Sequence, residues 1–170
     1  MAPDFTLSNA TGKSVTLSEQ LKSGPVVLTW YRGGWCPYCN IQLGAYQAVL
    51  PEIKELDGTL IALTPELPDR TLSTKEKNSL EFEVLSDVNQ KVANDYGLVF
   101  NLTPDVTEYY RQAFDLNAFN GKEAAADELP LAATYVIDTD GKIAYSFLSA
   151  NYKKRAEPVD ILEALAALKK

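Results

Sequence analysis

Hydrophobic residues in this chain occur in short runs that alternate with segments of helical periodicity. The runs are rich in β-branched and aromatic residues, which is typical of buried strands; they cover 25–31, 59–63, 82–85, 133–138 and 143–148. Between them the pattern predicts helices over 37–56, 71–78, 89–96, 105–114 and 158–168. Strands that alternate with helices indicate an α/β fold, with a mixed central sheet flanked by helices.

Local signals add detail to this arrangement. Residues 3–7 and 15–17 flank a polar turn, which predicts an N-terminal β-hairpin, and Ser18 is expected to cap a short helical turn. Pro51 is expected to bend the long helix near Leu50. Residues 98–131 show little pattern apart from one predicted helix. The core stripe of the long helix is expected to comprise Ile41, Ala45, Ala48, Val49, Ile53 and Leu56.

Composition narrows the class of protein. The chain has 170 residues, of which 46% are hydrophobic, and this predicts one domain over residues 1–170. A formal net charge of −7 disfavours nucleic acid and anionic membranes as partners. The apolar runs are too short to span a membrane. Residues 1–4 lack a basic and apolar signal segment, so we expect a cytoplasmic protein.

The only two cysteines, Cys36 and Cys39, lie in a CxxC motif between a predicted strand and a predicted helix. Gly33 and Gly34 form the turn before them, and Pro37 suits the first position of a helix. Cys36 is therefore expected at a helix N-terminus, where unpaired amides and the helix dipole favour a thiolate. Cys39 lies one turn deeper on the same face, within reach of a disulfide. We expect Cys36 to attack and Cys39 to resolve.

Three other roles for the pair compete with redox catalysis. The chain contains no histidine and no further cysteine, so a zinc site lacks ligands, and neither a metal nor a cofactor is expected. A purely structural disulfide would close a very small loop and restrain the unfolded chain little. Two inert buried thiols are a further alternative.

Several motifs together resemble a known family. Residues 27–39, with Trp35 directly before the cysteine, look like the active-site strand and helix of the thioredoxin fold. Residues 3–7, 84–98 and 134–141 are similar to segments of peroxiredoxins, in the alkyl hydroperoxide reductase/thiol-specific antioxidant group. The tetrapeptide Cys-Pro-Tyr-Cys also occurs in many glutaredoxins. The resemblance implies a thioredoxin-like fold and covers most of the chain outside residues 98–131.

The resemblance implies a thiol-dependent peroxidase. Cys36 would reduce hydrogen peroxide or an alkyl hydroperoxide, become a sulfenic acid and condense with Cys39. Thioredoxin, or a reductant of the glutathione/glutaredoxin type, would then reduce the disulfide, and a homodimer is a further expectation. Two alternatives stay open. They are a thiol-disulfide oxidoreductase acting on protein or glutathione disulfides, and a redox sensor without turnover.

The sequence departs from the family pattern at three positions. The usual proline and threonine before the peroxidatic cysteine are Thr29 and Gly33, and the usual active-site arginine falls on Ala132. Arg32 is the candidate to supply positive charge instead, although a surface arginine fits the sequence equally. Candidate substrate-binding residues are Gly33, Gly34 and Trp35, the glycines through their backbone amides. Residues 153–155 form a basic cluster expected to be solvated, and Tyr109 and Tyr110 are expected to serve packing.

Overall fold

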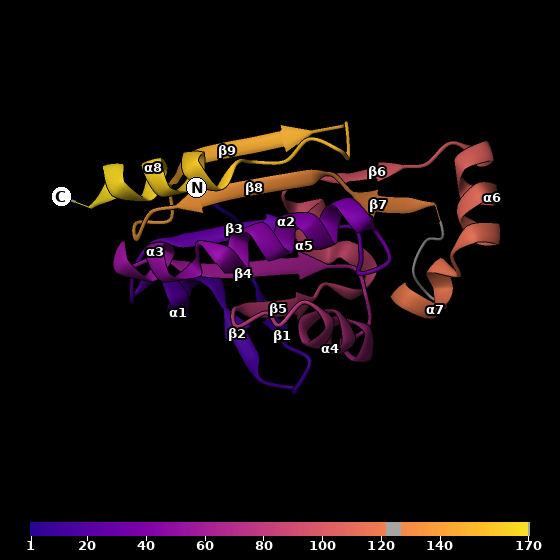
Figure 1. The fold of residues 1–170 in the computed structure, drawn as a ribbon, viewed down its shortest axis with the longest axis horizontal. Helices are drawn as coiled ribbons and strands as arrows, with labels where there is room; N and C mark the ends of the chain where they lie inside the picture. Colours follow the sequence, from indigo (N-terminus) through magenta and orange to yellow (C-terminus); the bar gives the residue numbers. More distant parts are fainter. Residues whose placement is uncertain (122–126, 170) are drawn as a thin grey trace.

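The computed structural model describes residues 1–121 and 127–169, and a five-stranded sheet runs through its centre (Figure 1). The strand order is β5-β4-β3-β8-β9, with β3, β4 and β5 parallel and β8 antiparallel to both of its neighbours. The mixed central sheet predicted from the sequence is thereby confirmed. Its strands are β3 (Val26–Trp30), β4 (Thr59–Thr64), β5 (Glu83–Ser86), β8 (Ala132–Ile137) and β9 (Ile143–Ser149).

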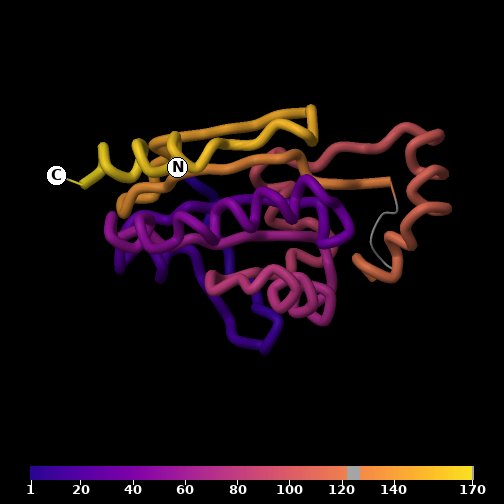
Figure 2. Tube along the Cα trace, viewed as in Figure 1, coloured from indigo at the N-terminus to yellow at the C-terminus, as the bar shows by residue number. Residues whose placement is uncertain are grey.

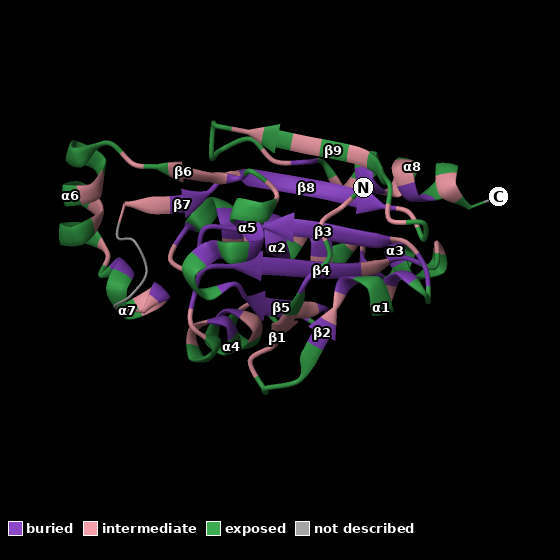
Figure 3. Cartoon of the chain, turned by 180° about the vertical axis from the view of Figure 1, so that it is seen from behind, coloured by how far each residue is buried: buried purple, intermediate pink, exposed green. Residues whose placement is uncertain are grey.

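Helices cover both faces of the sheet, because alternate side chains of a strand point to opposite sides. Val27 of β3 packs into a core with α2, α3 and α8, whereas Val26 and Leu28 pack with the N-terminal segment, α1 and α5 (Figures 1 and 3). Every residue of β3 is buried, so the strand that leads to the CxxC motif is held on both sides. These helices are α1 (Leu17–Leu21), α2 (Pro37–Ala48), α3 (Leu50–Glu55), α5 (Lys91–Asp95) and α8 (Pro158–Leu168).

The long helix predicted after Cys36 is divided at Val49 into α2 and α3, as the proline at position 51 led us to expect. Its predicted core stripe is wrong over α2, where Ile41 is 70% exposed. Gln42 and Tyr46 point inward instead, and Gln42 Nε2 donates a hydrogen bond to Tyr46 Oη at 2.9 Å. Polar side chains that satisfy one another can be buried, and hydrophobic periodicity does not detect them. The buried residues of α2 are Cys39, Gln42, Leu43 and Tyr46.

The predicted N-terminal hairpin is confirmed as β1 (Thr6–Ser8) paired antiparallel with β2 (Ser14–Thr16). The cap predicted for the short helix that follows is wrong. This helix, α1, begins at Leu17, and the Ser18 amide donates to Asp4 Oδ1 at 2.9 Å. The acceptor for this helix end thus comes from 14 residues earlier in the chain rather than from Ser18 itself.

Two further helices start away from their predicted positions. The helix α4 (Pro68–Lys77) begins at Pro68, three residues before its predicted start, and buries Thr71 and Thr74. The helix α5 begins only at Lys91, because Asn89 and Gln90 adopt left-handed backbone angles, with φ of 65° and 55°. Among the described residues, no helix is long and apolar enough to cross a membrane.

Most of the stretch 98–131, for which the sequence predicted only one helix, lies at the end of the sheet where α2 begins (Figures 1 and 2). Its predicted helix is confirmed, and an unpredicted pair of short antiparallel strands, β6 and β7, leads back into β8. Residues 122–126 of this stretch lie outside the described part of the chain. Its elements are β6 (Val99–Asn101), α6 (Pro104–Ala113), α7 (Leu116–Asn120) and β7 (Glu128–Pro130).

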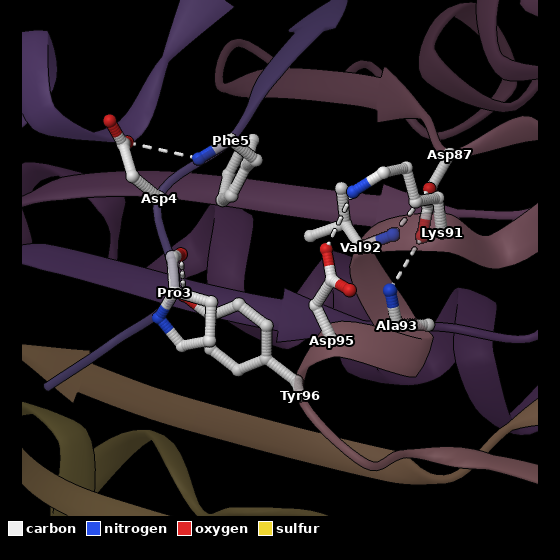
Figure 4. A network of polar contacts seen from close by, with 9 residues as sticks. All are labelled: Pro3, Asp4, Phe5, Asp87, Lys91, Val92, Ala93, Asp95 and Tyr96. Atoms are coloured by element: carbon white, nitrogen blue, oxygen red, sulfur yellow. Dashed lines mark hydrogen bonds and ion pairs between the residues drawn. The ribbon is translucent and has the colours of Figure 1, made fainter.

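A buried carboxylate fixes the turn after β5. Asp87 is 1% exposed and accepts the amides of Val92 and Ala93 at 3.0 and 2.8 Å, at the start of α5 (Figure 4). The C-terminal end of α5 in turn contacts the N-terminal segment of the chain, since Tyr96 Oη donates to the Pro3 carbonyl at 2.9 Å. One carboxylate therefore orients a helix that anchors the beginning of the chain.

We expect Asp87→Ala to lower the free energy of unfolding by about 2–4 kcal/mol, because it leaves two buried amides without an acceptor. Asp95→Ala is the matched control: it removes the exposed ion pair with Lys91 on the same helix and should change stability little. Urea unfolding followed by circular dichroism measures both variants. Equal losses in the two would contradict the role assigned to Asp87.

Candidate active site

Cys36 occupies the N-cap position of α2. Its backbone is extended, with φ −89° and ψ 114°, and Pro37 is the first helical residue, as the sequence predicts. The Cys36 amide donates to the Gly33 carbonyl at 3.1 Å, and the Cys36 carbonyl accepts the Cys39 amide at 3.1 Å. The Cys36 residue is only 2% exposed, so its sulfur lies in a largely desolvated environment.

Cys39 lies one turn further along α2 and is fully buried. A hydrogen bond from the Cys39 thiol is the main cause that lowers the pKa of Cys36 to about 6, against the opposing effect of burial. The Cys39 amide and the positive charges of Arg32 and Arg155 also lower it. The pKa of Cys39 is raised well above its usual value by the same hydrogen bond, by burial and by the charge on Cys36. At neutral pH Cys36 is thus the thiolate, and Cys39 is the thiol that donates to it.

Arg32 is a buried charge and not a surface arginine, since it is only 4% exposed. Its Cζ lies 5.0, 5.4 and 4.7 Å from the ring centroids of Trp35, Tyr110 and Tyr152. Its Nη2 also donates a hydrogen bond to Tyr110 Oη. Cation–π attraction is strengthened where water is excluded, so this aromatic cage holds the guanidinium beside the thiolate.

The packing role predicted for Tyr110 is therefore incomplete, because its ring and its hydroxyl orient Arg32. Tyr109, its neighbour on α6, is 64% exposed. The Trp35 ring stacks against Tyr110 and Phe114 of the same segment, with centroids 5.5 and 5.1 Å apart. The segment 98–131 thus contributes directly to the surroundings of the CxxC motif.

The two glycines before the motif are required by close contacts. Gly33 has φ 155°, and a Cβ there would overlap the Trp35 ring; a Cβ on Gly34 would overlap Thr74 Oγ1. The Gly34 amide donates to Glu66 Oε1 at 3.0 Å, so in this structure it is engaged within the protein. The glycines therefore shape the turn, and Glu66 holds it.

Glu66 is a functional candidate that the sequence analysis missed. It follows β4, is fully buried, and has a pKa that burial raises to about 7. Its Oε2 has no hydrogen-bond partner among the described residues. The available sequence signal was an acidic residue two positions after a buried strand end, at the sheet edge shared with the CxxC turn.

Two of the three departures from the family pattern, at Thr29 and Ala132, have structural counterparts. Thr29 is buried and its hydroxyl lies 2.8 Å from Thr134 Oγ1, so the residue at the usual proline position joins β3 to β8. Ala132 and Arg32 line the same cavity of about 250 Å³. Arg32, two residues after β3, therefore brings to this cavity the positive charge that the family pattern places on β8.

The basic cluster at residues 153–155, which was predicted to be solvated, is only partly so. Lys153 and Lys154 are exposed, whereas Arg155 is half-buried and its Nη2 lies 3.4 Å from Cys39 Sγ. The separation of 116 residues explains why no local pattern pointed to this contact. The structure thus brings Arg32, Cys36, Cys39 and Arg155 together. Outside residues 122–126 and 170, it holds no cluster of three or more acidic or thiol side chains suited to a metal ion.

We expect Cys39→Ala to raise the pKa of Cys36, because it removes the hydrogen bond that stabilises the thiolate most. Cys39→Ser keeps a hydroxyl donor and should leave this pKa closer to about 6. Ultraviolet absorbance of the thiolate against pH measures both variants. Identical pKa values in the two would contradict the assigned cause.

The same ionisation predicts a pH dependence of stability. The pKa of Cys36 is lower in the folded protein than in the unfolded chain, where a free thiol titrates near ~8.5. The stabilisation should therefore be fully present above that value and be lost as pH falls through about 6. Unfolding midpoints of the protein and of Cys36→Ser should diverge across this range. A constant difference would exclude the linkage.

Comparison with known proteins supports the resemblance seen in the sequence. The model of the AhpC/TSA family matches residues 1–146. A putative peroxiredoxin bcp of Helicobacter pylori strain J99 is 26% identical over 165 residues, which is 97% of this chain and 95% of that protein. A chloroplastic peroxiredoxin Q of Suaeda salsa is 31% identical over 102 residues, covering 60% of this chain and 47% of that protein. The chain thus spans about half of that relative's length.

Solved structures show the same fold. Peroxidoxin BcpB from Mycobacterium tuberculosis superimposes with a TM-score of 0.79 at 23% identity, over 99% of this chain and 96% of that one. The bacterioferritin comigratory protein of Xanthomonas campestris gives 0.74 at 16% identity, over 98% and 92%. The predicted thioredoxin-like fold is confirmed, and the extent of the family match shows that the chain belongs to the AhpC/TSA family.

Proposed function

We propose that this protein is a thiol-dependent peroxidase that reduces hydrogen peroxide or alkyl hydroperoxides through Cys36 and Cys39. The observation that carries the proposal is the placement of the pair: Cys36 is buried at the N-cap of α2, and Cys39 lies one turn further along with Arg155 Nη2 3.4 Å from its sulfur. Cys36 is an acidic thiol in a desolvated position, and Cys39 is a protonated thiol that donates to it. A thiolate is the reactive form of cysteine, and family membership favours peroxide as its oxidant.

In the first step the Cys36 thiolate attacks the terminal oxygen of the peroxide. The S–O bond forms as the O–O bond breaks, so that sulfur is oxidised to a sulfenic acid and the alkoxide or hydroxide leaves. The leaving oxygen becomes negatively charged in the transition state. A fixed positive charge in a site that excludes water stabilises such a charge strongly. The buried guanidinium of Arg32 is our candidate for this role.

In the second step Cys39 attacks the Cys36 sulfenic acid, forms a disulfide and releases water. Cys36 is the N-cap of α2 and Cys39 lies in its first turn, with the Cys39 amide bonded to the Cys36 carbonyl at 3.1 Å, so the two side chains lie one turn apart at the same helix end. A thiol donor such as thioredoxin, or one of the glutathione/glutaredoxin type, would then reduce the disulfide. A cytoplasmic location is part of the proposal, because such donors are kept reduced there.

A homodimer is a further proposal that the exposed sheet edge supports. The edge strand β9 leaves Ile143 and Leu148 exposed, at 38% and 49%, which offers a second copy an apolar surface.

The second candidate function is a thiol-disulfide oxidoreductase. An acidic cysteine at a helix N-terminus with a buried partner one turn later also suits exchange with protein or glutathione disulfides. The bacterioferritin comigratory protein of Xanthomonas campestris has alkyl peroxide reduction activity, and this favours the peroxidase for the present chain. The third alternative, a redox sensor without turnover, would not need a buried arginine surrounded by aromatic rings, so this feature favours an enzyme.

In a Cys39→Ser variant, Cys36 should react once with hydrogen peroxide and gain one oxygen, trappable as a sulfenic acid. Arg32→Ala in the same background should slow this step by about ten-fold or more beyond its effect on thiolate content, because it removes the charge nearest the leaving oxygen. Arg111→Ala is the control, since that arginine is exposed on α6. Stopped-flow mixing with intact-mass readout measures the rates.

The competing function gives a different result in the same experiment. A disulfide oxidoreductase would react with peroxide no faster than a model thiol of equal pKa, and would accumulate mixed disulfides with glutathione. That outcome would replace our first proposal by the second.

A further inference from the structure

We infer that Arg155 is a catalytic residue of the second half of the cycle, where its guanidinium stabilises Cys39 as the thiolate that attacks the Cys36 sulfenic acid. This inference rests on the proposed function, because it takes Cys39 as the resolving cysteine. The family resemblance gave no role to this position, and the arginine comes from the loop between β9 and α8.

The side chain is held in a defined orientation. One nitrogen, Nη1, donates to the carbonyl oxygens of Tyr152 and Lys154, so the guanidinium is fixed to its own loop. The other, Nη2, is directed at Cys39 Sγ, 3.4 Å away. Because the geometry exists before any reaction, no side chain has to be reorganised when charge develops on the sulfur.

The loop that carries Arg155 is itself attached to α2. Tyr46 Oη donates to the carbonyl of Ala156 at 3.0 Å and receives a hydrogen bond from Gln42. Tyr46 also lies 3.3 Å from Thr134 Oγ1, which belongs to β8. The helix that carries Cys39 and the loop that carries Arg155 are therefore joined by a buried network. This network explains why polar residues occupy the inner face of α2.

The charge balance around Cys39 changes during the cycle. In the reduced protein, the negative charge on Cys36 and the shared hydrogen bond raise the pKa of Cys39. Both effects vanish when Cys36 becomes a neutral sulfenic acid. Burial then still opposes the Cys39 thiolate, while the charge of Arg155 and the backbone amide of Arg32 favour it.

The other titratable groups around the pair do not compete for this role. Tyr31, directly after β3, and Tyr46, on α2, both have a raised pKa because they are buried, so they stay neutral near pH 7. The guanidinium of Arg32 acts on Cys36, and its backbone amide on Cys39. Arg155 thus supplies a positive charge to Cys39 once Cys36 is oxidised.

The step is balanced without a further reactant. Cys39 loses its proton, and its sulfur attacks Cys36 Sγ. The S–S bond forms as the S–O bond breaks, and the departing hydroxide takes up a proton to give water. In the recycling step the thiol donor attacks Cys36 and Cys39 leaves as a thiolate, so the same contact assists its departure.

The experiment follows both steps after one addition of hydrogen peroxide to the reduced protein, by quenched flow and intact mass. At a pH where Cys36 is fully ionised, Arg155→Gln should form the sulfenic acid at nearly the normal rate. Its disulfide should close about ten- to a hundred-fold more slowly, the range expected for losing a charge-assisted hydrogen bond. Arg155→Lys should restore part of the rate, and Lys154→Gln, an exposed neighbour, should leave both steps unchanged.

A second measurement separates catalysis from loop structure. In a Cys36→Ser background, Arg155→Gln should raise the apparent pKa of Cys39, measured by alkylation rate against pH. A merely structural loss would loosen the loop, admit water and shift this pKa downward. Arg155 lines a groove of about 470 Å³ between α2 and its loop, so a neutral side chain can be solvated there and the variant should fold.

The outcomes are distinguishable from those of the proposed function. Disulfide closure at the normal rate in Arg155→Gln, or a lowered pKa of Cys39, would overturn the inference while leaving the peroxidase intact. A Cys39→Ser protein that forms no sulfenic acid with peroxide would instead overturn the proposed function, and the inference with it.

Discussion

A negative charge on a buried sulfur atom is the constraint on which the rest of this site depends. Burial disfavours a thiolate, so the fold has to supply hydrogen bonds and positive charge in compensation. Cys39 donates the hydrogen bond, and Arg32 and Arg155 supply the charge from opposite ends of the chain. The strand β3, buried on both faces, fixes the point from which the CxxC turn leaves the sheet.

The arginine at this site lies at a different position in the fold from the one that the family resemblance implies. The strand β8 carries Ala132 where the family resemblance places an arginine, and Arg32, in the turn after β3, lines the same cavity. A buried guanidinium needs neighbours that stabilise its charge, and three aromatic rings do so here. One ring, that of Tyr110, comes from α6, the one helix predicted within residues 98–131. Tyr110 contacts Arg32 directly, and Phe114 supports it through the Trp35 ring.

The parts of the structure that were predicted correctly are those determined by residues close together in the sequence. The central strands, the N-terminal hairpin and the start of α2 at Cys36 follow from hydrophobic periodicity and from proline and glycine positions. The inner face of α2 was missed because its buried polar residues are hydrogen-bonded, Gln42 to Tyr46 and Tyr46 to the Ala156 carbonyl, which no periodicity reveals. The same applies to the cap of α1, whose acceptor is the distant Asp4.

At the site, the two cysteines and the location of Arg32 beside them could be read from the motif. Glu66 and Arg155 could not, because their roles depend on contacts across 32 and 116 residues of sequence. A buried carboxylate and an inward-facing arginine look like ordinary surface residues until the chain is folded. Long-range polar contacts were thus the main limit of prediction.

This separation along the chain has a consequence during synthesis. The CxxC motif leaves the ribosome long before Tyr110 and Arg155, and contacts over 78 and 116 residues form late because closing such loops costs entropy. Until then neither arginine is held against the sulfur atoms, so their share in lowering the pKa of Cys36 is missing. The thiolate of Cys36 therefore reaches its full stabilisation only with the completed fold.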